Sequence, residues 1–369
     1  MTLRAPFPYF GGKRRVAHLV WERFGDVPNY CEPFAGSLAV LLGRPHEPRT
    51  ETVNDLDCFI ANFWRALQVD PDAVASHADW PVNEADLHAR HQWLVDQTAW
   101  REAMKTNPEY SDAKVAGWWA WGISQWIGSG WCQKQAIKGS SIGGALAARG
   151  VHAKRPRIAS GGRGVTAKRL SMVKGTGMHR KLPRIDRGGT GVDCRNISRQ
   201  LPCLHGDSGA TGRGVHASGL TNRGGSLQEW MQALSDRLRR VRVCCGDWQR
   251  ILGPSPTTCI GTTAVFLDPP YASDRSAVYA EESFTVAHDV RAWCMANGDN
   301  PQLRIALCGY EGEHEMPASW DCVAWKANGG YGNSDRGREN AHKERIWFSP
   351  ACLKPAVSLG TQESIEGIA

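Results

Sequence analysis

The most informative stretch of this chain is Ala264-Val265-Phe266-Leu267-Asp268-Pro269-Pro270-Tyr271. Its first four residues form an apolar run with the length and composition of a buried strand. Because proline cannot continue a central strand, we expect this strand to end before Pro269. Asp268 is then expected at the carboxyl end of a strand, where open α/β sheets bind their ligands.

The residues after this strand suit chemistry on an exocyclic amine of a nucleobase. Such an amine is a poor nucleophile because its lone pair is delocalised into the ring. The Asp268 carboxylate and a backbone carbonyl can accept its two N–H bonds, while the Tyr271 ring can stack on a base that has left the duplex. Pro269 and Pro270 stiffen the backbone between them. A solvated aspartate in a simple turn is the alternative interpretation.

Three further segments are typical of a nucleotide-type site. The first is Pro6-Phe7-Pro8-Tyr9-Phe10-Gly11-Gly12-Lys13. In the second, residues 30–42, a strand end is followed by the small residues 35–37, which let the backbone approach a ligand, and then by a helix start. The third places Asp55 after a second short strand, where an acidic residue usually binds ribose hydroxyls. Each segment is a weak signal alone, but their order together with residues 268–271 is a strong one.

In this order the segments resemble those of the D12 class of adenine-specific DNA methyltransferases, the family of the Dam methylases. The resemblance extends over roughly residues 5–130 and 226–350. It implies an α/β fold with a Rossmann-like sheet that binds S-adenosylmethionine, and methyl transfer to the N6 amine of adenine in DNA. It assigns catalysis to Asp268, Pro269, Pro270 and Tyr271. It assigns the cofactor to Tyr9, Lys13, Glu32, Phe34, Gly36, Asp55, Asp247 and Asp268.

Two segments and two alternative functions stay open. Residues 307–310, Leu-Cys-Gly-Tyr, stand where many relatives carry a Ser-Asn pair after a strand. Glu344 opens a segment similar to the family's closing strand, which we interpret as structural. A cytosine-N4 methyltransferase is disfavoured by Asp rather than Ser at position 268. A DNA-binding relative without catalysis is disfavoured by the intact residues 268–271 and by Lys13.

The chain of 369 residues is long enough for a large α/β domain and a smaller one. Apolar residues at helical spacing predict helices over residues 56–70, 84–105, 112–128 and 227–242, with their tryptophans in the core. We expect a cofactor-binding and catalytic domain (1–65 and 240–350), a helical layer (66–130 and 226–240), a basic insert that recognises the target (131–225) and a flexible tail (351–369).

Composition predicts a soluble intracellular enzyme, and the resemblance implies the cytoplasm of a prokaryotic or phage-infected cell. No apolar run reaches the length of a membrane span, and no signal peptide is recognisable. We therefore expect the twelve cysteines to be reduced. We expect no metal, with a zinc site at Cys194, Cys203 and His205 as the weaker alternative. Double-stranded DNA is the expected partner, and we expect a monomer without an obligatory protein partner.

Positive charge is concentrated in residues 134–225. This segment holds 18 Lys or Arg and 3 acidic residues, a net charge of +15, so the rest of the chain carries −8. Its Gly-rich, imperfect repeats lack Trp, Tyr and Phe. Basic pairs recur in these repeats, at Lys154-Arg155, Lys168-Arg169 and Arg180-Lys181. We expect the pairs to contact DNA phosphates rather than to solvate a tether. The loop Gly128–Trp131 is a second candidate for DNA contact.

Overall fold

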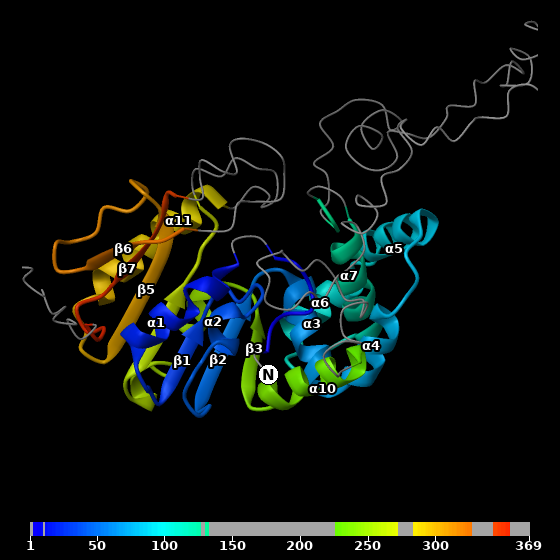
Figure 1. Ribbon diagram of the computed structural model, residues 1–369, viewed down its shortest axis with the longest axis horizontal. Helices are drawn as coiled ribbons and strands as arrows, with labels where there is room; N and C mark the ends of the chain where they lie inside the picture. Colours follow the sequence, from blue (N-terminus) through cyan, green and yellow to red (C-terminus); the bar gives the residue numbers. More distant parts are fainter. Residues whose placement is uncertain are drawn as a thin grey trace, which may run out of the picture.

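The computed structural model describes residues 3–9, 12–126, 130–132, 226–271, 283–326 and 342–354. These residues form a mixed sheet with helices around it (Figure 1). Its strands are β1 (Asn29–Glu32), β2 (Thr50–Asp55), β3 (Val241–Cys245), β4 (Thr263–Leu267), β5 (Leu303–Tyr310), β6 (Asp321–Ala324) and β7 (Glu344–Phe348). The seven strands lie in the order β3-β2-β1-β4-β5-β7-β6. Strands β1 to β5 are parallel, whereas β7 is antiparallel to its neighbours β5 and β6.

The strand order reverses between β1 and β4. From β1 the chain moves outward to β2 and β3, then returns to the other side of β1 with β4 and β5. Cys31 of β1 pairs with Val265 of β4, so the two strands end side by side. Open α/β sheets bind ligands outside the carboxyl ends of strands at such a switch point. The expected strand before Asp268 is therefore confirmed, and it lies at the switch point.

Apolar side chains leave the sheet on both faces, as the period of two in a strand requires. In β4, Ala264 and Phe266 join one core cluster, while Val265 and Leu267 join the other. The first cluster includes α1 (Ala17–Phe24), α2 (Ala39–Leu42) and α3 (Cys58–Val69). The second includes α11 (Ser283–Asn297) and the 3-10 helix η4 (Trp248–Ile251). Covering on both faces explains why β4 reads as a continuous apolar run.

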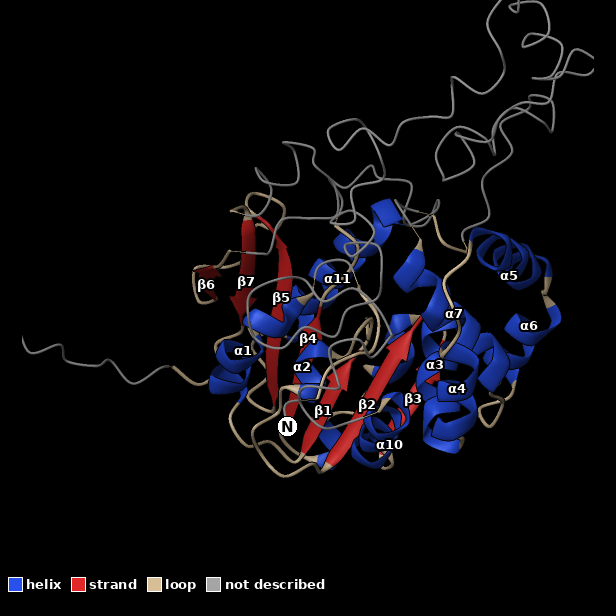
Figure 2. Cartoon of the chain, turned by 45° about the vertical axis from the view of Figure 1, so that its right-hand side comes forward, coloured by secondary structure: helices blue, strands red, loops and turns tan. Residues whose placement is uncertain are grey.

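A group of helices continues the molecule beyond β3 (Figure 2). It consists of α3, α4 (Pro71–Ala78), α5 (Glu84–Asp96), α6 (Ala99–Thr106), α7 (Ala113–Gln125) and α10 (Leu227–Leu238). Side chains that accept a backbone N–H begin five of these helices, namely Asp57, Asp70, Asn83, Asp112 and Ser226. Trp119 and Trp121 are buried, which confirms that the tryptophans of α7 belong to the core.

Two of the expected helices have different bounds. The segment 84–105 is broken at Gln97, which has an extended backbone after α5, so α6 starts anew after Thr98. The helix expected over 227–242 ends at Leu238, and the chain enters β3 at Val241. The helices expected over 56–70 and 112–128 are present as α3 and α7.

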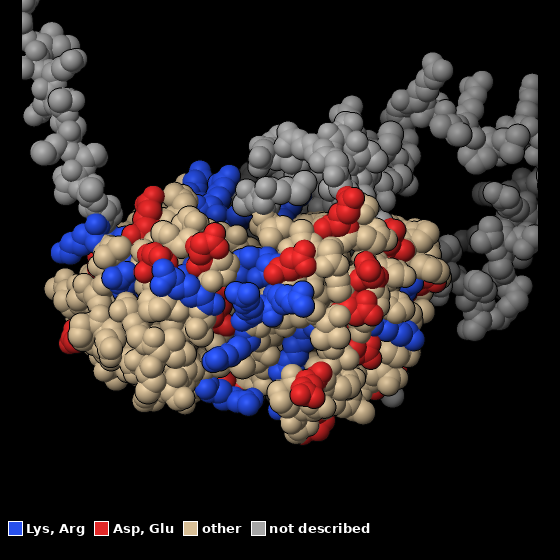
Figure 3. Space-filling view, turned by 90° about the horizontal axis from the view of Figure 1, so that it is seen from below, with Lys and Arg blue, Asp and Glu red and all other residues tan. Residues whose placement is uncertain are grey.

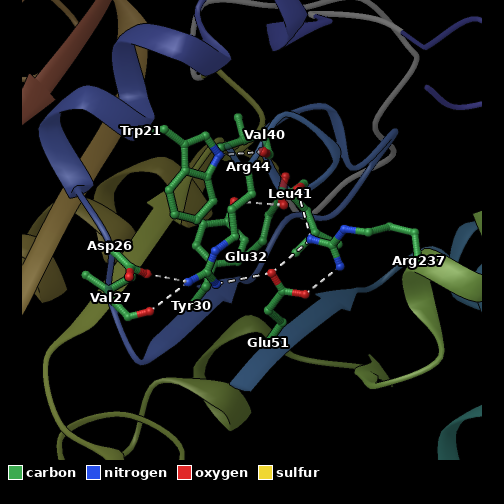
Figure 4. Close-up of polar contacts among 10 residues, drawn as sticks. All are labelled: Trp21, Asp26, Val27, Tyr30, Glu32, Val40, Leu41, Arg44, Glu51 and Arg237. Carbon is green, nitrogen blue, oxygen red and sulfur yellow. Dashed lines mark hydrogen bonds and ion pairs between the residues drawn. The ribbon is translucent and has the colours of Figure 1, made fainter. Parts of the chain in front are cut away.

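A buried ion cluster ties α10 to the sheet (Figure 4). Arg237 of α10 donates two hydrogen bonds to the Glu51 carboxylate of β2, at 2.7 and 2.9 Å. Arg44 donates a third to the same carboxylate, at 3.2 Å, and its guanidinium lies over the Trp21 ring. A buried carboxylate needs such partners to remain ionised. The cluster therefore fixes α10, the first helix after the insert, against the strand that ends in Asp55.

Several expectations lie outside the described residues. These are the basic pairs at 154–155, 168–169 and 180–181, the zinc alternative at Cys194, Cys203 and His205, and the tail beyond residue 354. Within the described ranges, no helix is long and apolar enough to cross a membrane. The same ranges contain no group of His, Cys, Asp and Glu side chains that could hold a metal ion.

Candidate active site

Lys13 lies at the centre of a polar cluster at the carboxyl edge of the sheet. It begins the 3-10 helix η1 (Lys13–Arg15) and is only 4% exposed. Its Nζ is 2.9 Å from Asp268 Oδ1 and donates a hydrogen bond to the Tyr271 hydroxyl at 3.0 Å. Glu344 Oε2 is 3.9 Å from the same ammonium and accepts the Tyr271 hydroxyl proton at 2.8 Å. We call Lys13, Asp268, Tyr271 and Glu344 the Lys13 cluster.

The charges of the Lys13 cluster fix its protonation state. Burial alone would lower the pKa of Lys13, but the carboxylates of Asp268 and Glu344 outweigh burial and raise that pKa above its usual value. Burial, followed by the Asp268 charge, raises the pKa of the Tyr271 phenol well above its usual value. At neutral pH Lys13 is therefore an ammonium ion and Tyr271 a neutral phenol, each able to donate a hydrogen bond.

Strand pairing brings together residues of the cluster that are far apart in sequence. Asp268 follows β4 directly, and β4 pairs with β5. Glu344 is the first residue of β7 and pairs with Tyr310, the last residue of β5. The Tyr310 ring contacts the Tyr271 ring edge to face, with centroids 4.5 Å apart. The expected closing strand is confirmed as β7, and the Glu344 side chain at its start also contacts Tyr271 and Lys13. Residues 307–310 lie inside β5, not after a strand.

The loop after β1 approaches Tyr9 closely. Gly36 has φ +46°, and a Cβ at this position would lie 2.5 Å from Tyr9 Cε1. Only glycine fits there without strain or collision. Phe34, nearby in the same loop, stacks on Trp248 with ring centroids 6.1 Å apart. Glu32, the last residue of β1, accepts the Tyr30 hydroxyl proton at 2.9 Å, and burial raises the pKa of its carboxyl to about 8.

Asp55 joins the ends of β1 and β2. Its Oδ2 accepts the Gly36 amide proton and its Oδ1 accepts the Asp57 amide proton, both at 2.9 Å. Burial, followed by the neighbouring Asp57 charge, raises the pKa of Asp55 to about 7. The buried Asn54 amide donates to the carbonyls of Pro33, at 3.2 Å, and Gly246, at 2.9 Å. The ends of three parallel strands are thus held together by two adjacent side chains.

Asp247 stands at the end of the neighbouring strand β3. It is exposed, and its Oδ1 accepts the Gln249 amide proton at 2.8 Å to begin η4. We call Tyr9, Gly36, Asp55 and Asp247 the Asp55 cluster. The two clusters follow the carboxyl ends of adjacent parallel strands, from β3 to β5, so they share one edge of the sheet.

Two further residues that the sequence brought into consideration lie outside both clusters. The Trp131 indole is buried, and its Nε1 donates to the Trp119 carbonyl at 3.1 Å. A ring packed in the helical core cannot stack on a base, so Trp131 is removed as a candidate for DNA contact. His314, interpreted as structural, lies 3.3 Å from the Cys308 carbonyl oxygen, and burial lowers its pKa to about 4.

Comparison with known proteins finds a similarity in the amino-terminal part of the chain. Residues 9–110 match the family model of the D12 class N6 adenine-specific DNA methyltransferase. The match includes Lys13, the loop after β1 and Asp55, whereas Asp268 lies beyond it. No curated protein matches the chain. Over residues 9–110, the chain is similar to the D12 class N6 adenine-specific DNA methyltransferases.

Proposed function

We propose that this protein transfers a methyl group from S-adenosylmethionine to the N6 amine of adenine in double-stranded DNA, on a Rossmann-like sheet. The Lys13 cluster holds the base and the Asp55 cluster holds the cofactor. One observation carries the proposal: Asp268, at the switch point of the sheet, is held by the Lys13 ammonium at 2.9 Å beside the Tyr271 ring.

The residues of the Asp55 cluster fit the donor groups of S-adenosylmethionine. Ribose hydroxyls and an adenine amine need acceptors, and the carboxylates of Asp55 and Asp247 lie at the ends of adjacent strands. The Asn54 Oδ1 atom, which belongs to the residue before Asp55, is buried and has no hydrogen-bond partner among the described residues. The half-buried Phe34 offers an apolar ring close by. When bound, S-adenosylmethionine supplies a methyl group activated by its sulfonium.

The Lys13 cluster would prepare the base amine as the nucleophile. Lys13 holds Asp268 Oδ1, so Oδ2 is the oxygen that Asp268 offers to an amine hydrogen. The Pro269 carbonyl would accept the other hydrogen, while Tyr271 stacks on a base that has swung out of the duplex. The Asp268 charge then stabilises the positive charge that develops on the nitrogen. Much of the rate enhancement would come from holding the two reactants in place.

The basic insert would supply the DNA contacts. Its net charge of +15 suits the phosphate backbone, and its position between the cofactor half and β4 is where relatives place target recognition. We assign phosphate contact to its three basic pairs, Lys154-Arg155, Lys168-Arg169 and Arg180-Lys181.

Transfer of a labelled methyl group to DNA tests the role of Asp268. Asp268→Asn keeps the shape of the side chain but removes its charge, so we expect transfer to fall about a hundredfold or more. Binding of S-adenosylmethionine, followed by calorimetry, should change little. Asp289→Asn is the matched control, because Asp289 is exposed on α11. Transfer at the wild-type rate by Asp268→Asn would refute the proposed mechanism.

A further inference from the structure

Two buried thiols face each other beneath the Asp55 cluster. The Cys245 thiol lies 3.7 Å from the Cys58 sulfur and donates a weak hydrogen bond to it. Cys245 is the last residue of β3, and Cys58 is the first residue of α3. Both are reduced. Sulfur atoms at this distance are in contact and need only a small movement to bond.

The two thiols have different reactivity. Cys58 is 9% exposed and stands at the amino terminus of a helix, whereas Cys245 is 1% exposed. The hydrogen bond from Cys245, together with the more distant Lys105 and Arg101 charges, lowers the pKa of Cys58 despite its burial. The same interaction raises the pKa of Cys245. Cys58 is therefore the more acidic and the less deeply buried of the two thiols, and Cys245 lies behind it.

The pair is directly connected to the residues proposed to bind the cofactor. Asp55 pairs with Cys245 in the sheet, and the Gly246 amide donates to the Asp55 carbonyl at 3.1 Å. Cys58 lies three residues after Asp55 and follows Asp57, whose amide donates to the Asp55 carboxylate. A backbone movement that brings the two sulfur atoms together would displace the residues around Asp55 and Asp247.

We propose that Cys58 and Cys245 form a peroxide-sensitive dithiol that closes to a disulfide and thereby weakens binding at the Asp55 cluster. The second half of this proposal rests on the proposed function. Disulfides in proteins of reducing compartments are usually transient and redox-sensing, which is the behaviour assigned here.

The oxidation needs one molecule of peroxide. The Cys58 thiolate attacks a peroxide oxygen, the O–O bond breaks, and the leaving hydroxide takes up a proton to become water, which leaves a sulfenic acid on Cys58. The Cys245 sulfur then attacks the Cys58 sulfur, the S–O bond breaks, and a second water leaves with the Cys245 proton. Two thiols are oxidised by two electrons, and one peroxide is reduced to two waters.

The disulfide cannot form without a shift in the backbone or the side chains. The sulfur atoms must approach from 3.7 Å to about 2.05 Å, a movement of about 1.6 Å. Cys58 lies in the first turn of α3 and Cys245 at the end of β3. Both cysteines are therefore next to turns that are proposed to bind the cofactor. We expect affinity for S-adenosylmethionine to fall about tenfold in the oxidised protein.

Peptide mapping of the full-length protein after hydrogen peroxide treatment tests the site. Free thiols are alkylated before digestion, and the expected product is a peptide that joins residues 58 and 245 and is released by dithiothreitol. Cys259→Ser is the matched control, because Cys259 is exposed and outside the pair, and this variant should form the same product. Cys58→Ser should not form it. Separate alkylation of both cysteines in the wild-type protein would overturn the proposal.

Calorimetry with S-adenosylmethionine on the same samples distinguishes the proposed regulation by the dithiol from the proposed cofactor site. The oxidised protein should bind more weakly and recover with dithiothreitol, while oxidised Cys58→Ser should keep the affinity of its reduced form. Equal affinity with and without the disulfide would overturn the regulatory role. Failure of the fully reduced protein to bind would instead count against the proposed cofactor site, whatever the peptide map shows.

Discussion

At the scale of single residues, the site depends on how the neighbouring side chains share the ammonium ion of Lys13. Lys13 is buried among two carboxylates and a phenol, and its closest contact is Asp268. Removing one partner of a buried ion pair leaves the other charge uncompensated. Glu344 is the second carboxylate beside the ammonium, at 3.9 Å, and it accepts the Tyr271 hydroxyl proton at 2.8 Å. We therefore regard Glu344 as a positioning residue for both Lys13 and Tyr271.

Glu344→Gln tests this role. The amide keeps the size of the side chain but loses the charge-assisted hydrogen bond to Tyr271 and the ion pair with Lys13, so kcat should fall about tenfold, equivalent to roughly 1.4 kcal/mol. Tyr271→Phe should add little to this loss, because the hydroxyl acts through the same contact. Methyl-transfer kinetics of the two single variants and the double variant measure the coupling. Glu311→Gln, in an exposed ion pair with Arg345, is the control and should change nothing. Fully additive losses would contradict the shared role.

The raised pKa of Asp55, about 7, predicts how cofactor binding depends on pH. Below this pKa the carboxyl is protonated, and above it the carboxylate is a stronger acceptor for ribose hydroxyls. Affinity for S-adenosylmethionine should therefore rise between about pH 6 and about pH 8. Calorimetry across this range measures it, and Asp55→Asn controls for titration of the ligand's own amine. A pH dependence identical in the variant would show that Asp55 does not bind the cofactor.

At the scale of elements, local patterns predicted the strands but not every partner. The apolar run before Asp268 indicates β4, because a strand covered on both faces must be apolar throughout. The break at Gln97 between α5 and α6 was missed, since it carries neither glycine nor proline. Glu344 was missed as a site residue because its contact with Tyr271 depends on the antiparallel pairing of β7 with β5. No local periodicity reports such a pairing.

Gly36→Ala tests the close approach of the β1 loop to Tyr9. The added Cβ would lie 2.5 Å from Tyr9 Cε1 at a backbone φ of +46°, so both collision and strain are expected. Affinity for S-adenosylmethionine should fall, and so should the thermal midpoint of unfolding. Gly312→Ala is the matched control, since Gly312 has φ +79° but no atom within 4 Å of an added Cβ. If both variants behave alike, strain alone explains the effect and the Tyr9 contact is unimportant.

At the scale of the whole molecule, positive charge occurs in two regions. One is the basic insert, and the other is a group of arginines at the amino-terminal edge of the sheet. Figure 3 shows Lys and Arg side chains gathered in the middle of the lower face. Arg49, just before β2, and Arg239 and Arg240, just before β3, are exposed at the amino-terminal edge of the sheet. This edge is opposite the two clusters of the site. These arginines therefore provide a comparison for the basic pairs of the insert.

The salt dependence of DNA binding tests whether the basic pairs of the insert contact DNA phosphates. Each phosphate neutralised releases condensed counterions, so replacing the pairs 154–155, 168–169 and 180–181 with Ser should flatten the slope of log affinity against log salt by about one unit per lost contact. Affinity for S-adenosylmethionine should stay the same. Replacing Arg239 and Arg240 with Ser is the control, and it should leave the slope nearly unchanged. An unaltered slope in the insert variant would mean that the repeats are a solvated tether.

Identification of the methylated base shows whether the protein methylates the N6 amine of adenine in DNA. DNA treated with the protein and S-adenosylmethionine is digested to nucleosides, which are separated and identified by mass spectrometry. We predict N6-methyladenine as the modified nucleoside, and its loss when Asp268→Asn replaces the wild-type protein. The appearance of N4-methylcytosine instead, or of no methylated base although DNA is bound, would contradict the account.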